Sequence, residues 1–326
     1  MIRRRNPAPA ATRDSVKGGL ARFALRRLLG LVPTLFVIVA AAFFLMRLAP
    51  GGPFDEERAV PAEITANLQA AYGLDQPVVV QFARYLRGLV RGDLGPSFRM
   101  KDFTVGELIA RGLPVTLAIG TAALLLSLAI GVPLGLVAAL RQNRWLDHAA
   151  MAVALVGIAV PSFVVAPLLA LAFGIGLGWL PVAGWETGSV RHAVLPVITL
   201  ALPLVAALAR LTRGSLLEVL QAPYIRTARA RGLGPAVILR RHALKPTLMP
   251  VVSFLGPATA ALLTGSLVVE QVFGLPGVGR YFVQGAVNRD YTLVMGMVIF
   301  YASLILLLNL VVDLLYGWLD PRIRHG

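Results

Sequence analysis

Six stretches of the chain lack Asp, Glu, Lys and Arg and are long enough to cross a membrane as helices. They lie between residues 27 and 47, 111 and 141, 147 and 186, 191 and 210, 245 and 270, and 290 and 313. A helix of about 20 apolar residues spans the hydrocarbon core of a bilayer. The third stretch is too long for one helix, and Gly and Pro in GIGLGWLPVAGW are expected to end it near Phe173. The pattern predicts an all-α membrane protein with six transmembrane helices.

Residues 49–112, between the first two spans, are predicted to form a loop that contains short helices. The segments PAEITANLQAAYGLD and QPVVVQFARYLRGLVRGD both have helical patterns. The second segment places Val79, Phe82, Leu86 and Leu89 on one face, and the turn-rich GDLGPS ends it. This apolar face is suited either to cap the membrane domain or to receive an external partner.

The composition supports a membrane protein and excludes several kinds of site. Hydrophobic residues make up 57% of the 326 residues, and the mean hydropathy is +0.75. The chain contains no cysteine, which excludes disulfides, thiolate metal sites and a cysteine nucleophile. A net charge of +15 would suggest nucleic-acid binding in a soluble protein. Beside membrane spans, however, basic residues set the orientation, so we expect no nucleic-acid partner.

The basic residues are distributed unequally between the two ends of the predicted spans. The segment before the first span contains eight Lys and Arg residues, and the connection 210–246 contains another eight. The short connections on the opposite side contain only Arg191, Arg280 and Arg289. Because short cytoplasmic loops are enriched in Lys and Arg, both termini are predicted to be cytoplasmic and the long loop periplasmic. Residues 1–22 are predicted to be a disordered basic tail near anionic lipid headgroups.

The segment YIRTARARG, in the connection 210–246, is predicted to form a helix of about two turns. Pro223 suits the first turn of this helix, and Gly232 suits its end. The helical period places Tyr224, Thr227, Ala228 and Arg231 on one side and Arg226 and Arg229 on the other. The small residues Ala228 and Gly232 are expected to let another backbone come close. The alternative is a basic loop that only orients the chain.

This segment resembles the loop signature of membrane subunits of binding-protein-dependent ABC importers, in which Gly follows an Ala-rich turn three residues later. It is similar to the peptide-importer branch, although Leu244-Lys245 stands where many members have Leu-Pro. Further matching segments follow in order: RRLLGLVPTLFVIVAAAFFLMRLAPGGPF, GDLGPSF, KDFTV, VPSFVVAPLL, LTRGSLLEVL, VVEQVFGLPGVGRYFVQGAVNRDY and NLVVDLLYGWLDPRIR. The resemblance covers residues 23–324 and is strongest to the B-type permeases of oligopeptide importers.

The resemblance implies a type I ABC importer permease fold over residues 23–326, in the bacterial inner membrane. It implies a homologous second permease of the C type, two ATPase subunits that bind ATP and Mg, and a periplasmic or lipid-anchored peptide-binding protein. The residues expected to couple to the ATPase are Tyr224, Ile225, Arg226, Thr227, Ala228, Arg229, Ala230, Arg231 and Gly232. Importers of dipeptides, glutathione, murein peptides or nickel complexes share this architecture and remain alternatives in substrate.

The chain itself is expected to be neither an enzyme nor a cofactor-binding protein. A phosphate-binding loop needs Gly-x4-Gly-Lys-Ser/Thr, but Lys17, Lys101 and Lys245 are followed by Gly, Asp and Pro. ATP must therefore be hydrolysed by another chain. The four histidines are too scattered for a helical zinc pair, so no metal site is predicted.

The main alternative of another class is an ion-coupled secondary transporter, which usually carries ionisable groups inside its spans. Here Glu270 and Asp313 come near, each at the end of its span. We expect Glu270 to stabilise the external turn GLPGVG, and Asp313 with Asn309 to pack near the cytoplasmic face. The candidate residues for a translocation path or gate are Pro161, Ser162, Glu270, Asn309 and Asp313.

Overall fold

The computed structural model describes residues 13–48, 73–100 and 102–319, and the side chains of residues 13–26, 265, 313 and 315–319 are not described. The described chain is almost entirely helical, with a single isolated bridge between Pro96 and Thr104. The helices are α1 (Arg13–Leu48), α3 (Val78–Val90), α4 (Val105–Leu140), α5 (Trp145–Ala159), α6 (Ser162–Leu169), α7 (Val190–Gln221), α8 (Pro223–Ala230), α9 (Pro235–Ile238), α10 (Leu244–Val272), α11 (Val278–Val287) and α12 (Tyr291–Leu319), with π-helical segments η1 (Ala170–Gly176) and η2 (Leu239–Ala243).

Five helical stretches within the described residues are long and apolar enough to cross a membrane. They are Arg27–Leu48, Val105–Leu140, Val190–Gln221, Pro235–Val272 and Tyr291–Val312. A sixth span results if α5 and the α6–η1 segment are counted together, although they are bent by 102°. This confirms the predicted all-helical membrane fold and its six spans, one of them broken.

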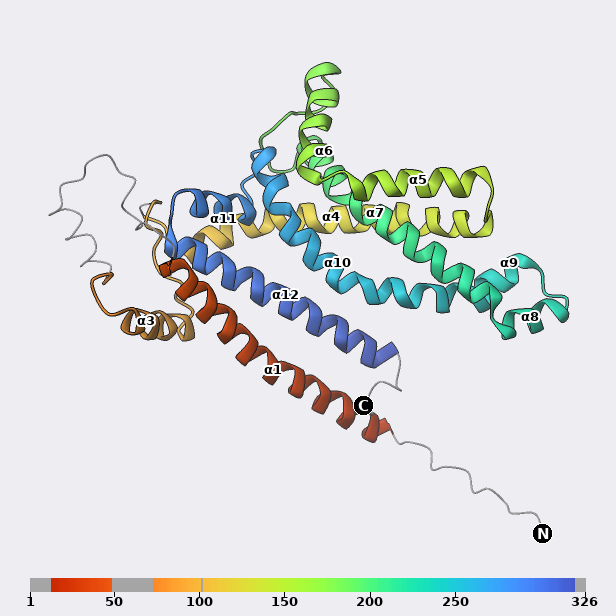
Figure 1. Cartoon of the computed structure of the whole chain (residues 1–326), viewed down its shortest axis with the longest axis horizontal. Helices are drawn as coiled ribbons and strands as arrows, with labels where there is room; N and C mark the ends of the chain where they lie inside the picture. Colours follow the sequence, from red (N-terminus) through yellow and green to blue (C-terminus); the bar gives the residue numbers. More distant parts are fainter. Residues whose placement is uncertain (1–12, 49–72, 101, 320–326) are drawn as a thin grey trace, which may run out of the picture.

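The break in the third predicted span is a correction. A single helix ending near Phe173 was expected, but the helix stops at Ala159 and restarts at Ser162 before ending at Gly176. Val160 is extended, with φ −89° and ψ 118°, because the ring of Pro161 disfavours the helical conformation of the residue before it. Figure 1 shows α6 turning away from the bundle at this point.

Three predicted boundaries also shift, because helices begin earlier or end later than the charge pattern indicates. Residues 13–22, predicted to be disordered, belong to α1, since the prolines of the N-terminal segment, Pro7 and Pro9, precede Arg13 and none follows before Pro33 inside the helix. Residues 1–12 lie outside the described part of the chain. The connection predicted over 210–246 is shorter, because α7 continues to Gln221 and α10 starts at Leu244.

The periplasmic loop predicted over residues 49–112 is likewise shortened by the start of α4. Thr104 forms a capping box with Glu107, in which the Thr104 hydroxyl accepts from the Glu107 N–H and the Glu107 carboxylate accepts from the Thr104 N–H. This arrangement satisfies N–H groups that a helix start leaves unpaired, so α4 begins at Val105. The first short helix predicted in the loop, over residues 61–75, lies largely outside the described residues.

The second predicted loop helix is present as α3, and it packs against the outer part of α1. The ring of Phe82 lies 5.1 Å from that of Phe43 and 5.2 Å from that of Phe44, between centroids. Leu86 also packs in this cluster, but Val79 is 70% exposed, so the predicted apolar face is correct except at Val79. In Figure 1, α3 lies beside the end of α1 that is remote from the N-terminus.

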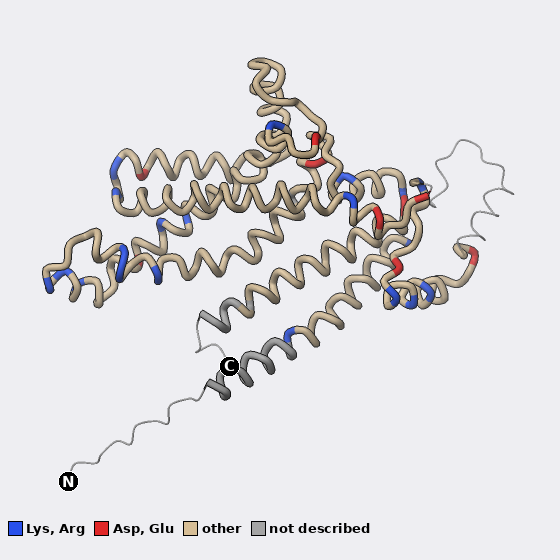
Figure 2. The backbone as a smooth tube through the Cα atoms, turned by 180° about the vertical axis from the view of Figure 1, so that it is seen from behind, with Lys and Arg blue, Asp and Glu red and all other residues tan. Residues whose placement is uncertain are grey.

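The main core lies where α4, α7 and α10 meet, and α1 and α12 form a second pair beside it (Figure 1). Ile119, Leu208 and Val251 represent the three helices of the main core, and all are buried. Figure 2 shows that Lys and Arg lie toward the two ends of the long helices and in their connections. The central part of the bundle is left apolar, as a membrane requires.

Candidate coupling and translocation sites

Helix α8 is the predicted cytoplasmic helix, and it lies with α9 at the end of the bundle opposite to α3 and α11 (Figure 1). Pro223 occupies its first turn, where a missing N–H costs no hydrogen bond. The Thr227 hydroxyl donates to the Pro223 carbonyl oxygen at 3.2 Å. Gly232 closes the helix in a left-handed conformation with φ +78°, and its N–H donates to the Arg229 carbonyl at 2.9 Å.

One face of α8 is buried against the rest of the chain. Ile225 is fully buried and Ala228 is 7% exposed, and they belong to an apolar group that we call the α8 cluster. Its buried members are Ala139, Leu216, Ile225, Ala228, Ile238 and Ala243. The cluster fastens α8 to the ends of α4 and α7 and to the α9–η2 segment.

The burial of Ala228 corrects the expectation that this residue meets another protein. The prediction grouped Ala228 with Tyr224 and Thr227 on one side of the helix, but Tyr224 and Thr227 are exposed while Ala228 belongs to the α8 cluster. A small side chain is needed there because α8 approaches its own chain. The exposed surface of α8 consists instead of Tyr224, Arg226, Thr227, Arg229 and Ala230, followed by Arg231 and Gly232.

A partly buried ion pair connects α5 to α7. Arg213 donates two hydrogen bonds to the Asp147 carboxylate, from Nε to Oδ1 at 2.5 Å and from a terminal nitrogen to Oδ2 at 2.8 Å. The Asn143 N–H donates to the same carboxylate at 3.0 Å. The Asp147 side chain is only 1% exposed, so water competes little for these bonds.

At the other end of the bundle, Glu270 holds the turn between α10 and α11. The Thr116 hydroxyl donates to Glu270 Oε1 at 2.8 Å, and the Gly279 N–H donates to Oε2 at 2.7 Å. Thr116 in turn accepts from the Val278 N–H at 3.0 Å. The carboxylate therefore lies at the start of α11, where helix N–H groups favour negative charge. The predicted role of Glu270 in stabilising the GLPGVG turn is confirmed.

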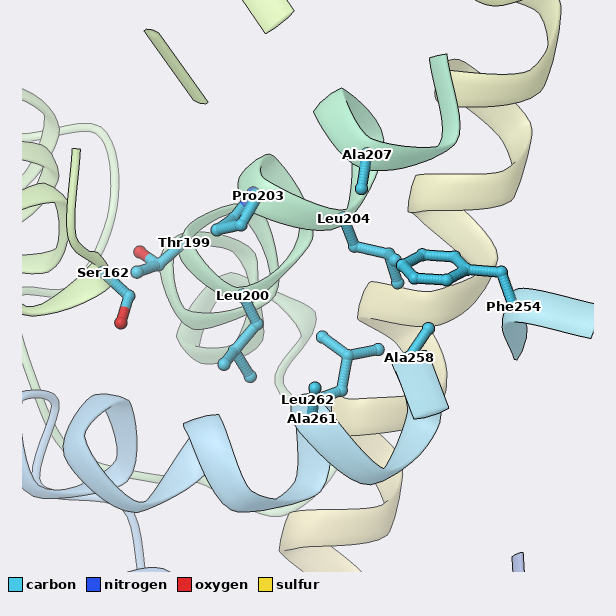
Figure 3. A pocket seen from close by; sticks show the side chains of 10 residues that line it. All are labelled: Ser162, Thr199, Leu200, Pro203, Leu204, Ala207, Phe254, Ala258, Ala261 and Leu262. Carbon is cyan, nitrogen blue, oxygen red and sulfur yellow. The ribbon is translucent and has the colours of Figure 1, made fainter. Parts of the chain in front are cut away.

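A pocket of about 240 Å³ opens between α6, α7 and α10 (Figure 3). Its walls are mostly apolar, and they include two hydroxyl groups. The lining residues are Ser162, Thr199, Leu200, Pro203, Leu204, Ala207, Phe254, Ala258, Ala261 and Leu262. Three elements that are distant in sequence thus surround one hollow beside the break in the third span.

The structure does not bring the predicted path residues together. Ser162 lines the pocket, and Pro161 is exposed at the break beside it. Glu270 is fully buried in its hydrogen-bonded turn, so it lines no open path in this conformation. Asn309 is exposed on α12, away from the pocket, and Asp313 lies in α12 with a side chain that is not described.

Sequence reasoning missed the ion pair and most of the pocket. Asp147 served only as the boundary of an apolar stretch, and Arg213 was counted only as one of eight basic residues. The available signal was the carboxylate of Asp147 in the first turn of an otherwise apolar helix. A carboxylate that is buried there requires a cationic or hydrogen-bonding partner. The pocket residues on α7 and α10 are apolar, and their pattern does not distinguish them from core residues.

Comparison with protein families gives two matches that together cover most of the chain. Residues 131–325 match the family described as "Binding-protein-dependent transport system inner membrane component". Residues 20–120 match the N-terminal family of the same transport-system membrane components.

Curated relatives and solved structures agree with these matches. An oligopeptide transport system permease protein, OppB, from Salmonella typhimurium strain LT2 is 50% identical over 94% of this chain and 100% of that protein. A dipeptide transport system permease protein, DppB, from Bacillus subtilis strain 168 is 43% identical over 94% of this chain and 98% of that protein. The inward-facing MetNI methionine ABC transporter shares the fold, with a TM-score of 0.54 at 20% identity over 63% of this chain and 93% of that chain.

Proposed function

Because the chain belongs to the family of binding-protein-dependent transport system inner membrane components, we propose that it is the membrane-spanning permease subunit of an ATP-driven peptide importer. The observation that carries this proposal is an end-to-end similarity to a permease whose name states oligopeptide transport. The similarity includes α8, whose exposed arginines and buried apolar face suit a helix that another protein pushes.

The proposal includes partners that supply energy and substrate. Two ATPase subunits bind ATP and Mg, and one of them receives the exposed basic surface of α8 through charge-assisted contacts to Arg226 and Arg229. A second, C-type permease completes the membrane domain. The outward-turned α6–η1 segment supports a second membrane chain, because Phe163 and Ile175 on it are 58% and 66% exposed. A periplasmic or lipid-anchored binding protein delivers the peptide.

The orientation follows from the basic residues. We place both termini and α8 in the cytoplasm, and α3 with α11 on the periplasmic side of the inner membrane, because Lys and Arg concentrate in short cytoplasmic segments. For the substrate we favour oligopeptides. Dipeptides are the second candidate, because a dipeptide permease matches the chain over the same extent at lower identity.

The test is transport by the whole complex in proteoliposomes. The four membrane-associated subunits are reconstituted with ATP inside and binding protein with labelled di-, tri- and longer peptides outside. We expect uptake that requires ATP and the binding protein, that persists when ionophores dissipate ion gradients, and that favours longer peptides. Uptake driven by an ion gradient without ATP would instead support an ion-coupled secondary transporter.

Two controls separate the role of this chain from that of its partners. Purified alone, the chain should hydrolyse no nucleotide, because it lacks a phosphate-binding lysine loop. A complex whose ATPases carry a substitution of their own phosphate-loop lysine should assemble but transport nothing. Hydrolysis that co-purifies with this single chain, and is lost when the chain is mutated, would contradict the proposal.

A further inference from the structure

The pair Asp147–Arg213 lies where it can fix the position of α5 relative to α7. Arg213 is eight residues before the end of α7 at Gln221, and α8 starts two residues after that end. Asp147 is in the first turn of α5, after the short turn that follows α4. A displacement of α8 therefore reaches α7 directly, but it reaches α5 through contacts between helices.

Those contacts differ in how firmly they resist sliding. The α8 cluster, as described, contains residues of α4, α7, α8, α9 and η2 but none of α5. Farther along α5, a side-chain atom at Gly157 would lie 3.2 Å from the Leu202 carbonyl and 3.3 Å from Ala206, so small residues allow the two helices to approach closely there. Smooth apolar packing permits small shear movements between helices. A bidentate ion pair resists such movement. Its two donor–acceptor distances, 2.5 and 2.8 Å, both change as soon as one helix slides along the other.

We propose that Asp147 and Arg213 are positioning residues that make α5 move together with α7 when α8 is displaced. The inference rests on the proposed function, because it assigns the pair to the transmission of ATP-driven movement. The far end of α5 is Ala159, next to the break at Pro161, and it lies about 18 Å from Asp147 at 1.5 Å per residue. There Ser162 borders the pocket between α6, α7 and α10, so the pair connects the coupling helix to the wall of that pocket.

The consequence is a loss of coupling when the pair is removed. Without the pair, a displacement of α8 still moves α7, but α5 no longer moves by the same amount. The position of the pocket wall at Ser162 then no longer depends on nucleotide binding by the ATPases. ATP hydrolysis then continues with less transport. A pair that served only to stabilise the fold would lower the amount of complex and leave the transport per ATP unchanged.

The first experiment measures labelled peptide transported per ATP hydrolysed by the reconstituted complex. Arg213→Gln is expected to lower this ratio at least about fivefold, the lower edge of typical coupling effects. Asp147→Asn, which keeps the volume and the acceptor for Asn143, should lower it similarly, and Arg213→Lys should restore part of it. The matched control is Arg144→Gln, which removes an exposed cation from the same cytoplasmic edge and should leave the ratio unchanged.

The second experiment measures the movement itself and uses the absence of native cysteines. Nitroxide labels at Ala152→Cys on α5 and Glu218→Cys on α7, both exposed positions, report the distance between the helices. We expect the distance to stay constant on ATP binding in the parent complex and to shift or broaden in Arg213→Gln. An unchanged transport ratio or an unchanged distance in Arg213→Gln, in a system whose parent complex transports with ATP, overturns this inference alone. A parent complex that transports without ATP overturns the proposed function and the inference with it.

Discussion

Gly232 shows how one residue can shape the end of α8 through its backbone alone. Its φ of +78° lies in the left-handed region that glycine adopts without steric cost. No atom lies within 4 Å of the position where a Cβ would be added. The conformation, and not a lack of space, therefore requires glycine at the end of α8.

We predict that Gly232→Val inserts and assembles but loses peptide-stimulated ATP hydrolysis. The substitution opposes the left-handed turn by about 1–3 kcal/mol and so disturbs the exit from α8. The control is Gly234→Val, because Gly234 has an ordinary φ of −69° and equal free space. Expression, complex assembly and stimulated hydrolysis are measured for both variants. Normal transport by Gly232→Val, or a defect in insertion only, would show that the segment merely orients the chain.

Gly279 illustrates the opposite requirement, a close approach of backbones. A Cβ there would lie 2.6 Å from the Cα of Leu267 and 2.9 Å from Glu270 Oε2. The Gly279 N–H also donates to that carboxylate. Glycine at this position lets the start of α11 sit directly on α10, where Glu270 holds it.

We predict that Gly279→Ala destabilises the permease by about 1–3 kcal/mol, the usual cost of an overpacked site. The matched control is Gly106→Ala, at the second position of α4, where nothing lies within 4 Å of the added carbon. The midpoint of thermal unfolding in detergent should fall for the first variant and stay level or rise for the second. Equal midpoints would mean that α11 does not rest on α10 in solution.

At the scale of elements, α3 is fastened to α1 mainly by aromatic side chains. Phe82 contributes its ring to contacts with Phe43 and Phe44, and with Phe36 at a centroid distance of 6.2 Å. Val90, the last residue of α3, is 88% exposed. The attachment of α3 therefore depends on few side chains, and it should be sensitive to a single truncation.

We predict that Phe82→Ala loosens α3 from α1 while the membrane bundle stays folded. Truncating a fully buried Phe to Ala costs about 3–5 kcal/mol of stability, and truncating a partly buried one should cost less. A loss of about 1.4 kcal/mol already makes the local opening of α3 tenfold more frequent. Hydrogen–deuterium exchange of the α3 amides should accelerate about tenfold, with α7 unchanged. Val79→Ala, at a position that is 70% exposed, is the control and should have little effect. Equal exchange in both variants would indicate another attachment.

At the scale of the whole molecule, helix length and charge together define two aqueous ends. Helix α7 has 32 residues. At 1.5 Å per residue, this is about 48 Å, which exceeds a hydrocarbon core of about 30 Å. Some of its length must therefore project beyond the membrane core. Figure 2 shows basic residues near the end of the bundle that carries α8 and near the end that carries α3.

We predict that these two ends label from opposite sides of the membrane. Val90→Cys on α3 and Gly234→Cys after α8 are exposed single positions in a chain without native cysteine. An impermeant thiol reagent applied to intact cells should modify Val90→Cys only, and permeabilised cells should modify both. Labelling of both from one side would refute the orientation.

The sequence by itself determined the spans, the short helix α8 and the class of protein. Long uncharged stretches require helices in a membrane, since backbone groups there must be paired within the chain. Pro223 and Gly232 delimit α8 through local backbone preferences, and the ordered motifs led to the family later matched. These features depend on residues a few positions apart, which is why they can be read from the chain.

Only the tertiary structure decided which groups meet across the bundle. Asp147 pairs with Arg213 over 66 positions, and Glu270 pairs with Thr116 over 154. The sequence favoured an outward-facing Ala228, and packing buried it, because α8 has to seat against α4 and α7. Whether an apolar residue lines a pocket or fills a core depends on how several helices cross, and no local pattern contains that information.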